Sequence, residues 1–188
     1  MKISFEYSSV YDELLTHMTK NQYNNEQFLE MQSNSLKFEK HWRKNEDKIT
    51  KEIQKVSGLK FNQNVKCFIV KHLGFRAISY PLTIKFTKDF KYLTAVLIHE
   101  LIHILLMNNE KILNLVKKKF SYYENDIKIH FPVLLIERKV IENLFGNDFL
   151  NNVLIKDDHN QELAYEWSLV NKYYNKFDKN ITKFLEKC

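Results

Sequence analysis

The chain has 188 residues, of which 44% are hydrophobic and 28% are charged, and its 14 Phe and 10 Tyr exclude an intrinsically disordered protein. This length predicts one domain, residues 1–188, with enough chain to bury a core. The formal net charge is +6, but the lysines are scattered and their densest run is only Lys117–Lys119, which argues against binding to nucleic acid.

Cysteine usage and the N-terminal residues predict a cytoplasmic protein. Only Cys67 and Cys188 occur, far apart and in no metal-ligand spacing, which is typical of a reducing compartment. Residues 1–6 lack the apolar core of a signal peptide. The longest apolar stretch, residues 96–107, is interrupted by His and Glu and is too short to cross a membrane, so no membrane partner is expected. The sequence leaves the oligomeric state open.

Helices are predicted throughout the N-terminal part, residues 1–57. Apolar residues from Val10 to Gln32 recur at helical spacing, but the polar residues 21–25 divide them, which predicts a helix in two pieces. A further helix is predicted from Ser35 to Val56. Gly58 ends it, because glycine adopts the left-handed conformation at little cost.

The pattern then changes to that of a small sheet followed by a buried helix. Val65–Val70 is rich in β-branched residues, and Leu82–Phe86 alternates between apolar and polar residues, so both are predicted strands. Pro81 precedes the second strand, which suits the edge of a sheet. The helix predicted from Asp89 to Met107 is apolar over most of its circumference and is therefore expected to be buried.

Three more helices are predicted in the C-terminal half. The first covers Glu110 to Tyr123, and the second has Pro132 in its first turn and ends at Gly146. The last covers residues 161–187. The predicted fold class is therefore α+β: mostly helical, with a small β-sheet before the buried helix, and a central core over residues 59–146.

The buried helix carries a pattern typical of zinc enzymes, His99-Glu100-Leu101-Ile102-His103. On a helix, His99 and His103 lie about 40° apart around the axis and roughly 6 Å apart along it, so both imidazoles can bind one zinc ion. Glu100 points to the side of the metal, where its carboxylate can take a proton from water instead of binding the ion. Burying these groups in an apolar helix is costly unless they are paired, and a metal ion is the simplest compensation. A buried histidine pair with a purely structural role is the alternative.

Two predicted strands leading into a helix with His-Glu-x-x-His resemble the catalytic core of the zincin metallopeptidases, over about Leu59 to Gly146. The segments Ser57–Phe61 and His130–Val133 are also similar to a group of small prokaryotic zincin-like proteins. This second resemblance implies no particular activity. The resemblance to zincins implies a zinc-dependent peptidase in which the strand nearest the helix, Leu82–Phe86, pairs with an extended peptide substrate. The third histidine that marks the metzincins is absent after His103.

A catalytic zinc ion takes three protein ligands, and the sequence leaves two candidates for the third. His130 and Glu137 are seven residues apart, close to two helical turns, so both can face the metal-binding helix. The resemblance to the gluzincins favours Glu137, and the resemblance to the small zincin-like proteins favours His130, which we place slightly ahead. The other residue would then lie nearby, with Glu137 orienting an imidazole or His130 stabilising an oxyanion.

Several other polar residues carry weaker signals. Glu162 and Glu166 share a predicted helix face beside Tyr165, a spacing typical of solvated carboxylates. Tyr122, Tyr123 and Tyr165 are candidates for oxyanion donors, but ordinary aromatic packing explains them equally well.

The sequence therefore predicts a hydrolase with one zinc ion that cleaves peptide bonds in a peptide or protein substrate, with Glu100 as general base. The alternative from another class is a zinc-stabilised domain without catalysis, whose long helices bind a protein partner and whose metal has a fourth protein ligand. A third interpretation is a regulatory protease that acts on one specific partner. The substrate itself cannot be read from the sequence, because specificity depends on side chains brought together by the fold.

Overall fold

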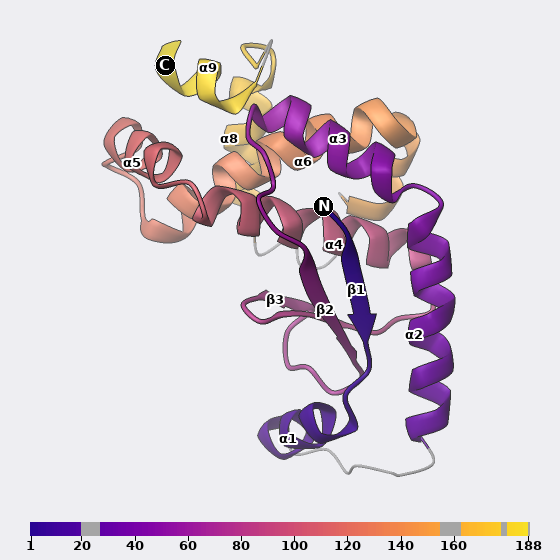
Figure 1. Cartoon of the computed structure of the whole chain (residues 1–188). Coiled ribbons are helices and arrows are strands. Elements are labelled where there is room, and N and C mark those ends of the chain that lie inside the picture. The colour runs from indigo at the N-terminus through magenta and orange to yellow at the C-terminus, as the bar shows by residue number, and fades with distance from the viewer. Residues whose placement is uncertain (20–26, 155–162, 178–179, 188) are drawn as a thin grey trace. The chain divides into compact units, whose positions relative to one another are not determined.

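The computed structural model describes residues 1–19, 27–154, 163–177 and 180–187 (Figure 1). The fold class is α+β and mostly helical, with one small four-stranded sheet, as the sequence predicts. Of the predicted C-terminal helix, residues 161–162, which include Glu162, and residues 178–179 lie outside the described part of the chain.

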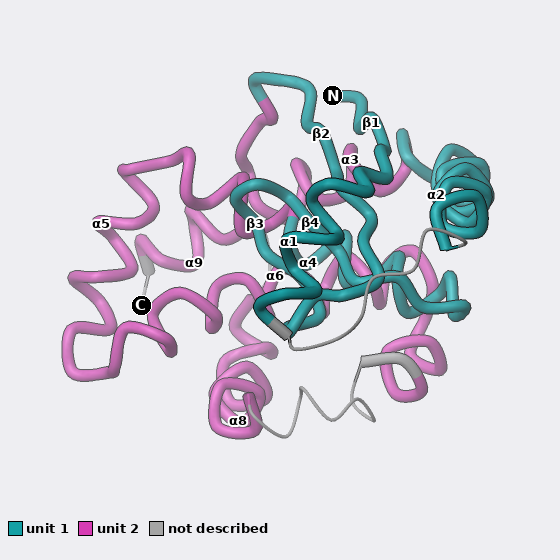
Figure 2. Tube along the Cα trace, turned by 90° about the horizontal axis from the view of Figure 1, so that it is seen from below, with its two compact units in different colours: residues 1–47, 62–100 teal, residues 48–61, 101–188 magenta. Residues whose placement is uncertain are grey.

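The chain divides into two compact units, which Figure 2 colours separately. The first unit comprises residues 1–47 and 62–100, and the second comprises residues 48–61 and 101–188. Two helices, α3 (Glu46–Ser57) and α4 (Phe90–Met107), contribute residues to both units. The single domain over residues 1–188 stays a prediction.

The sheet belongs to the first unit and has the strand order β1-β2-β4-β3. Its strands are β1 (Ile3–Glu6), β2 (Val65–Val70), β3 (Ala77–Ser79) and β4 (Leu82–Lys85). β1–β2 and β2–β4 are parallel pairs, and β3–β4 is antiparallel. Both predicted strands are confirmed, but placing the second at an edge is wrong, because β4 pairs with β2 on one side and with β3 on the other.

Helices α1 (Ser9–Thr19) and α2 (Gln27–Arg43) pack on opposite faces of this sheet. Phe5 and Phe68 point to opposite faces, because Phe5 is opposite Cys67 in the register and side chains alternate along a strand. Phe5 contacts Phe38 of α2, with ring centroids 5.5 Å apart. Phe68 contacts Tyr11 of α1 at the same centroid distance, 5.5 Å. The two helices therefore bury both faces of the strand pair β1–β2.

A single helix from Ser35 to Val56 is a wrong prediction, since α2 ends at Arg43 and α3 begins at Glu46. The buried Glu46 carboxylate explains the break. It accepts a hydrogen bond from the Ile3 backbone N–H (2.9 Å) and pairs with Arg43 (2.6 Å), which ties the start of α3 to β1. Gly58 ends α3 as predicted, with φ 74° and its N–H bonded to the Gln54 carbonyl (2.8 Å).

Helix α4 carries the predicted metal-binding motif and begins where the sequence places it. Asp89 caps its first turn, because its carboxylate accepts hydrogen bonds from the N–H groups of Lys91 (2.9 Å) and Tyr92 (3.1 Å). By length and composition α4 could cross a membrane, yet 78% of it is buried within the protein. That degree of burial fits the core helix of a globular protein, which is what its all-round apolar surface predicts.

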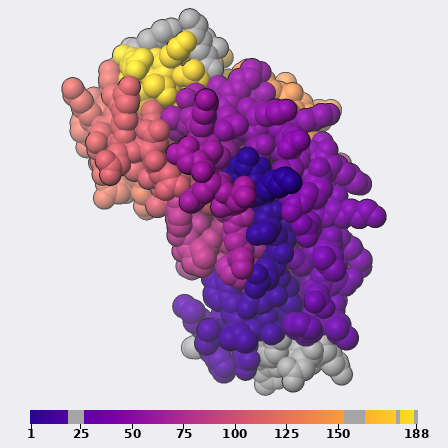
Figure 3. Space-filling model, in the orientation of Figure 1, coloured from indigo at the N-terminus to yellow at the C-terminus, as the bar shows by residue number. Residues whose placement is uncertain are grey.

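The second unit also contains α5 (Glu110–Lys119), α6 (Asn125–Phe149), η1 (Leu150–Leu154), α8 (Ala164–Tyr174) and α9 (Ile181–Lys187). Figure 3 shows the yellow α9 against the salmon α5, which it contacts. Aromatic rings from the end of α5, α6, α8 and α9 meet in one cluster: Phe120, Phe131, Tyr173 and Phe184. Three of these rings are buried and Tyr173 is half-buried, so the cluster forms part of the core of this unit.

Two predicted boundaries in this unit are wrong. Pro132 lies inside α6 and not in its first turn, because the helix begins at Asn125. The single predicted C-terminal helix is divided between α8 and α9. The break predicted at Gly146 is present, since this residue has a non-helical φ of 81° where α6 kinks.

Candidate metal centre

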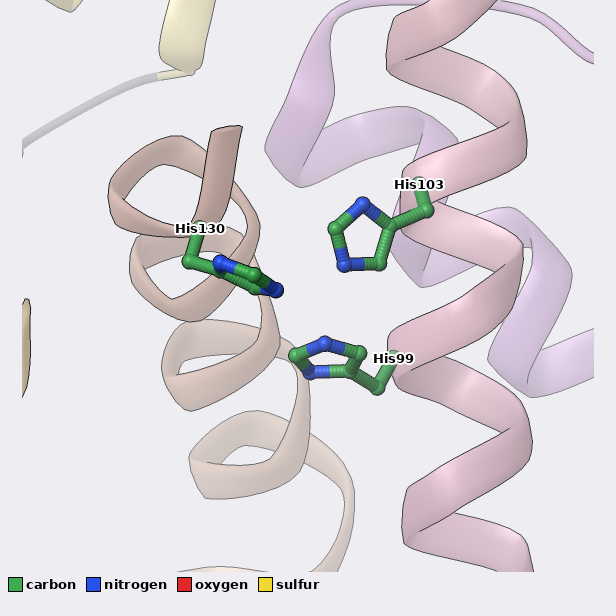
Figure 4. Close-up of side chains that lie close together, drawn as sticks. All are labelled: His99, His103 and His130. Atoms are coloured by element: carbon green, nitrogen blue, oxygen red, sulfur yellow. The ribbon is translucent and has the colours of Figure 1, made fainter. Parts of the chain in front are cut away.

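Two histidines of α4 form one side of the candidate site. His99 and His103 are 2% and 7% exposed, so both imidazoles lie in the protein interior. They are four residues apart on one continuous helix, and Figure 4 shows both rings pointing from α4 in the same direction. The predicted stacking of the two rings along one helix face is therefore present.

The third histidine, His130, comes from α6 and points toward the other two (Figure 4). Its ring lies edge-on to that of His103, with centroids 5.2 Å apart and an interplanar angle of 87°. Its Nδ1 lies 3.1 Å from the Asp126 backbone carbonyl. A carbonyl oxygen can only accept, so Nδ1 is the donor of this hydrogen bond, and Nε2 is the atom that His130 would offer to a metal ion.

The three imidazoles fit a metal ion. The ligand atoms of His99, His103 and His130 all lie within 4.8 Å of one another. Two nitrogen ligands of a tetrahedral zinc ion are about 3.3 Å apart, given zinc–nitrogen bonds of about 2.0–2.1 Å. Small side-chain rotations therefore bring the three nitrogens to ligand distance, and neutral imidazole is a common ligand of zinc and other transition metals. The three histidines could hold a metal ion.

Glu100, next to the first histidine, is held in place by the sheet. Its side chain is nearly buried, and its Oε2 accepts a hydrogen bond of 2.5 Å from the hydroxyl of Ser79 in the edge strand β3. Burial is the main cause that raises the pKa of the Cys67 thiol, and the negative charge of Glu100 raises this pKa further. This free thiol therefore stays protonated, and it is not among the groups that could hold a metal ion in the described part of the chain.

The other candidate ligand, Glu137, is buried in α6 with 1% of its surface exposed. It is not a member of the group formed by the three histidines. Seven residues separate it from His130, a rise of about 10 Å along the helix axis. Of the two candidates for the third ligand, the structure brings only His130 into the group with His99 and His103.

Replacing His130 by Ala is expected to weaken zinc binding by at least about a hundredfold, whereas Glu137→Gln should weaken it by less than about tenfold. Loss of a ligand removes a bond, while a neighbouring group acts only through the orientation of the ligands. The measurement is competition for zinc with a chelator of known affinity. A larger loss in Glu137→Gln than in His130→Ala would make Glu137 the ligand.

An apolar cavity lies directly beside His103, entirely within the second unit. Its volume is about 220 Å³. Besides His103 and the two lysines Lys117 and Lys128 its lining is apolar: Leu106, Met107, Ile112, Leu113, Val116, Ile129, Pro132 and Val133. These residues come from the end of α4, from α5 and from the first half of α6. Sequence reasoning missed this cavity, because nothing in a helical apolar pattern distinguishes a residue that lines a cavity from one that fills the core.

Sequence reasoning also missed Ser79. Its strand has only three residues and pairs in antiparallel fashion with β4 after a tight turn at Pro81. A three-residue strand is too short to give an alternating pattern. The one signal for it was its place directly before the predicted strand that leads to the metal-binding helix.

No family model matches the chain, and neither a curated protein nor a solved structure matches it. A proposal about function therefore rests on the geometry of the site.

Proposed function

We propose that this protein is a zinc-dependent hydrolase of the metallopeptidase type, with zinc held by His99, His103 and His130. The observation that carries the proposal is the convergence of three imidazoles within 4.8 Å of one another on α4 and α6. The motif on α4 adds a carboxylate, Glu100, one position from the first imidazole. Three nitrogen ligands with an adjacent general base are the residues that hydrolytic zinc chemistry requires.

The number of ligands favours catalysis over a structural role. A structural zinc site is closed by four protein ligands, whereas a catalytic site has three and keeps one position open. In the described ranges, the group that could hold the ion has three members. This supports the hydrolase over the alternative of a zinc-stabilised interaction domain.

Glu100 and Ser79 have different roles in the proposed reaction. Zinc, when bound, supplies a Lewis acid that acidifies water and polarises a carbonyl group. Glu100 takes the proton from the attacking water and passes it to the amine that leaves. Ser79 positions the Glu100 carboxylate through the hydrogen bond to Oε2, which restricts the rotamers of a side chain that is otherwise flexible.

Among the described residues, strand β3 forms the edge of the sheet beside Glu100. The resemblance to zincins implied pairing along Leu82–Phe86, but both edges of β4 are occupied by β2 and β3. The edge strand on this side is β3, which carries Ser79. We therefore propose that the peptide adds to β3 as a further strand of the sheet.

The expected result is zinc-dependent cleavage of peptides. The purified protein, incubated with a mixture of unmodified peptides, should generate new amino termini that mass spectrometry identifies. Removal of metal with a chelator should abolish cleavage, and addition of one equivalent of zinc should restore it, because three ligands alone cannot activate water. Zinc binding without cleavage of any peptide would instead favour the non-catalytic domain or a protease restricted to one partner.

A further inference from the structure

A second hollow lies within the second unit, at the N-terminal end of α6. Its volume is about 470 Å³. Its walls carry three tyrosines and three carboxylates: Tyr122, Tyr123, Tyr165, Glu124, Asp126 and Glu166. No lysine or arginine lines it among the described residues, although the chain as a whole has a formal net charge of +6. Its local charge is therefore opposite in sign to that of the protein.

Glu166 is the buried member of this lining. Its residue surface is 7% exposed, where the sequence pattern predicts a solvated carboxylate. Its side chain lines the hollow together with Glu124 and Asp126. The attraction between a buried carboxylate and a cation is screened less by solvent than that of an exposed one, so Glu166 favours a cation in the hollow.

The tyrosines provide the faces that an organic cation prefers. The ring centroids of Tyr122 and Tyr123 are 6.0 Å apart, and those of Tyr123 and Tyr165 are 6.4 Å apart. Tyr122 is 84% exposed and Tyr165 54%, so these rings are accessible to a ligand. The negative face of an aromatic ring attracts a cation within about 6 Å of its centroid.

The arrangement favours an extended organic cation over a metal ion. In the described part of the chain the carboxylates of Glu124, Asp126 and Glu166 do not form a group that could hold a metal ion. They surround the hollow instead of converging on one point. The N-terminus of α6 contributes only about half a positive charge, which three carboxylates outweigh. A guanidinium group suits this geometry, because it is planar, stacks on aromatic rings and donates hydrogen bonds in several directions.

We propose that this hollow binds the side chain of an arginine residue, with Glu166 as its buried ion partner. As a site for a substrate side chain, the proposal rests on the proposed peptidase function. The link is Asp126, which lines the hollow and whose backbone carbonyl accepts the hydrogen bond from His130. One helical turn of α6, about 6 Å, separates these two residues, so a peptide at the metal centre can reach the hollow with a neighbouring arginine.

The test measures binding of N-acetyl-L-arginine amide to the full chain by NMR titration. The matched probe is N-acetyl-L-citrulline amide, which has nearly the same shape and no charge. The arginine probe should bind about tenfold more tightly than the citrulline probe, and added salt should reduce the difference.

Three variants locate the site. Glu166→Gln keeps the size of the side chain and should weaken binding of the arginine probe about tenfold. Tyr122→Leu removes an exposed ring and should weaken it two- to fivefold, at about 0.5–1 kcal/mol for an exposed cation–π contact. Glu110→Gln, an exposed carboxylate of the same unit that does not line the hollow, should leave binding unchanged. Equal binding of the two probes, or unchanged binding in Glu166→Gln, overturns the proposal.

This test separates the hollow from the peptidase function, because binding of both probes is measured on the zinc-free protein, in which no zinc-dependent cleavage occurs. The arginine probe should bind His103→Ala as tightly as it binds the wild-type protein. If zinc or cleavage is absent but the arginine probe binds, the hollow stands as a site for basic peptides and the peptidase function fails. If cleavage depends on zinc but the arginine probe does not bind, the hollow fails alone.

Discussion

Replacing His103 by Ala is expected to reduce bound zinc from one ion per chain to little or none, as measured by elemental analysis of protein purified without chelators or a histidine tag. His103 follows His99 by one turn of α4, and its ring lies edge-on to that of His130. Its removal leaves two ligands, and two ligands bind zinc far more weakly than three.

A loss of zinc through misfolding can be told apart from the loss of a ligand. His17→Ala, at an exposed histidine of α1, is the matched control and should retain one zinc per chain. Zinc at a hundredfold excess over its Kd should stabilise the wild-type fold by about 2.7 kcal/mol, a rise in unfolding temperature on the order of 5–10 °C. His103→Ala should unfold cooperatively with no such rise. A folded wild-type protein that takes up no zinc would reduce His99, His103 and His130 to buried structural residues.

The parts of the fold that the sequence predicts well are those where one physical signal dominates. Val65–Val70 is a strand by composition, and it has the same bounds as β2. The apolar surface of α4 predicts its burial, and Asp89 predicts its start. In both elements, local propensity and tertiary packing favour the same structure, so no long-range information is needed.

The wrong sequence-based predictions concern elements whose structure depends on a tertiary contact. Nothing in the helical spacing from Ser35 to Val56 indicates a break, because the cause is a hydrogen bond from Ile3 to Glu46 across 43 positions of sequence. Strand β1 escapes prediction for the same reason, since its four residues become a strand by pairing with β2. The same distinction holds for the candidate site. Two ligands four residues apart on one helix are predicted from the sequence alone. The choice between His130 and Glu137 instead depends on how α6 packs against α4.

Replacing Glu100 by Gln is expected to lower turnover of a cleaved peptide by about 10²- to 10⁴-fold while one zinc per chain remains bound. Glutamine has nearly the same size and can still contact the Ser79 hydroxyl, but it cannot accept the proton of the attacking water. Loss of a general base costs a factor of this size. Zinc content and kcat are measured on the same preparation, so the catalytic loss is separated from any loss of metal.

The second variant of this pair, Ser79→Ala, distinguishes a proton acceptor from the group that positions it. Without the hydroxyl, the Glu100 carboxylate keeps its ability to take a proton but loses one restraint on its rotamer, so turnover should fall only about two- to tenfold. Equal losses in Glu100→Gln and Ser79→Ala would mean that positioning of the side chain by Ser79 contributes as much to turnover as the basicity of Glu100. Unchanged turnover in Glu100→Gln would exclude Glu100 as the general base. The Glu100 carboxylate would then be only a buried hydrogen-bond partner of the sheet. The combination of retained zinc, a large loss for Glu100→Gln and a small loss for Ser79→Ala is specific to a zinc hydrolase whose general base is held by its edge strand.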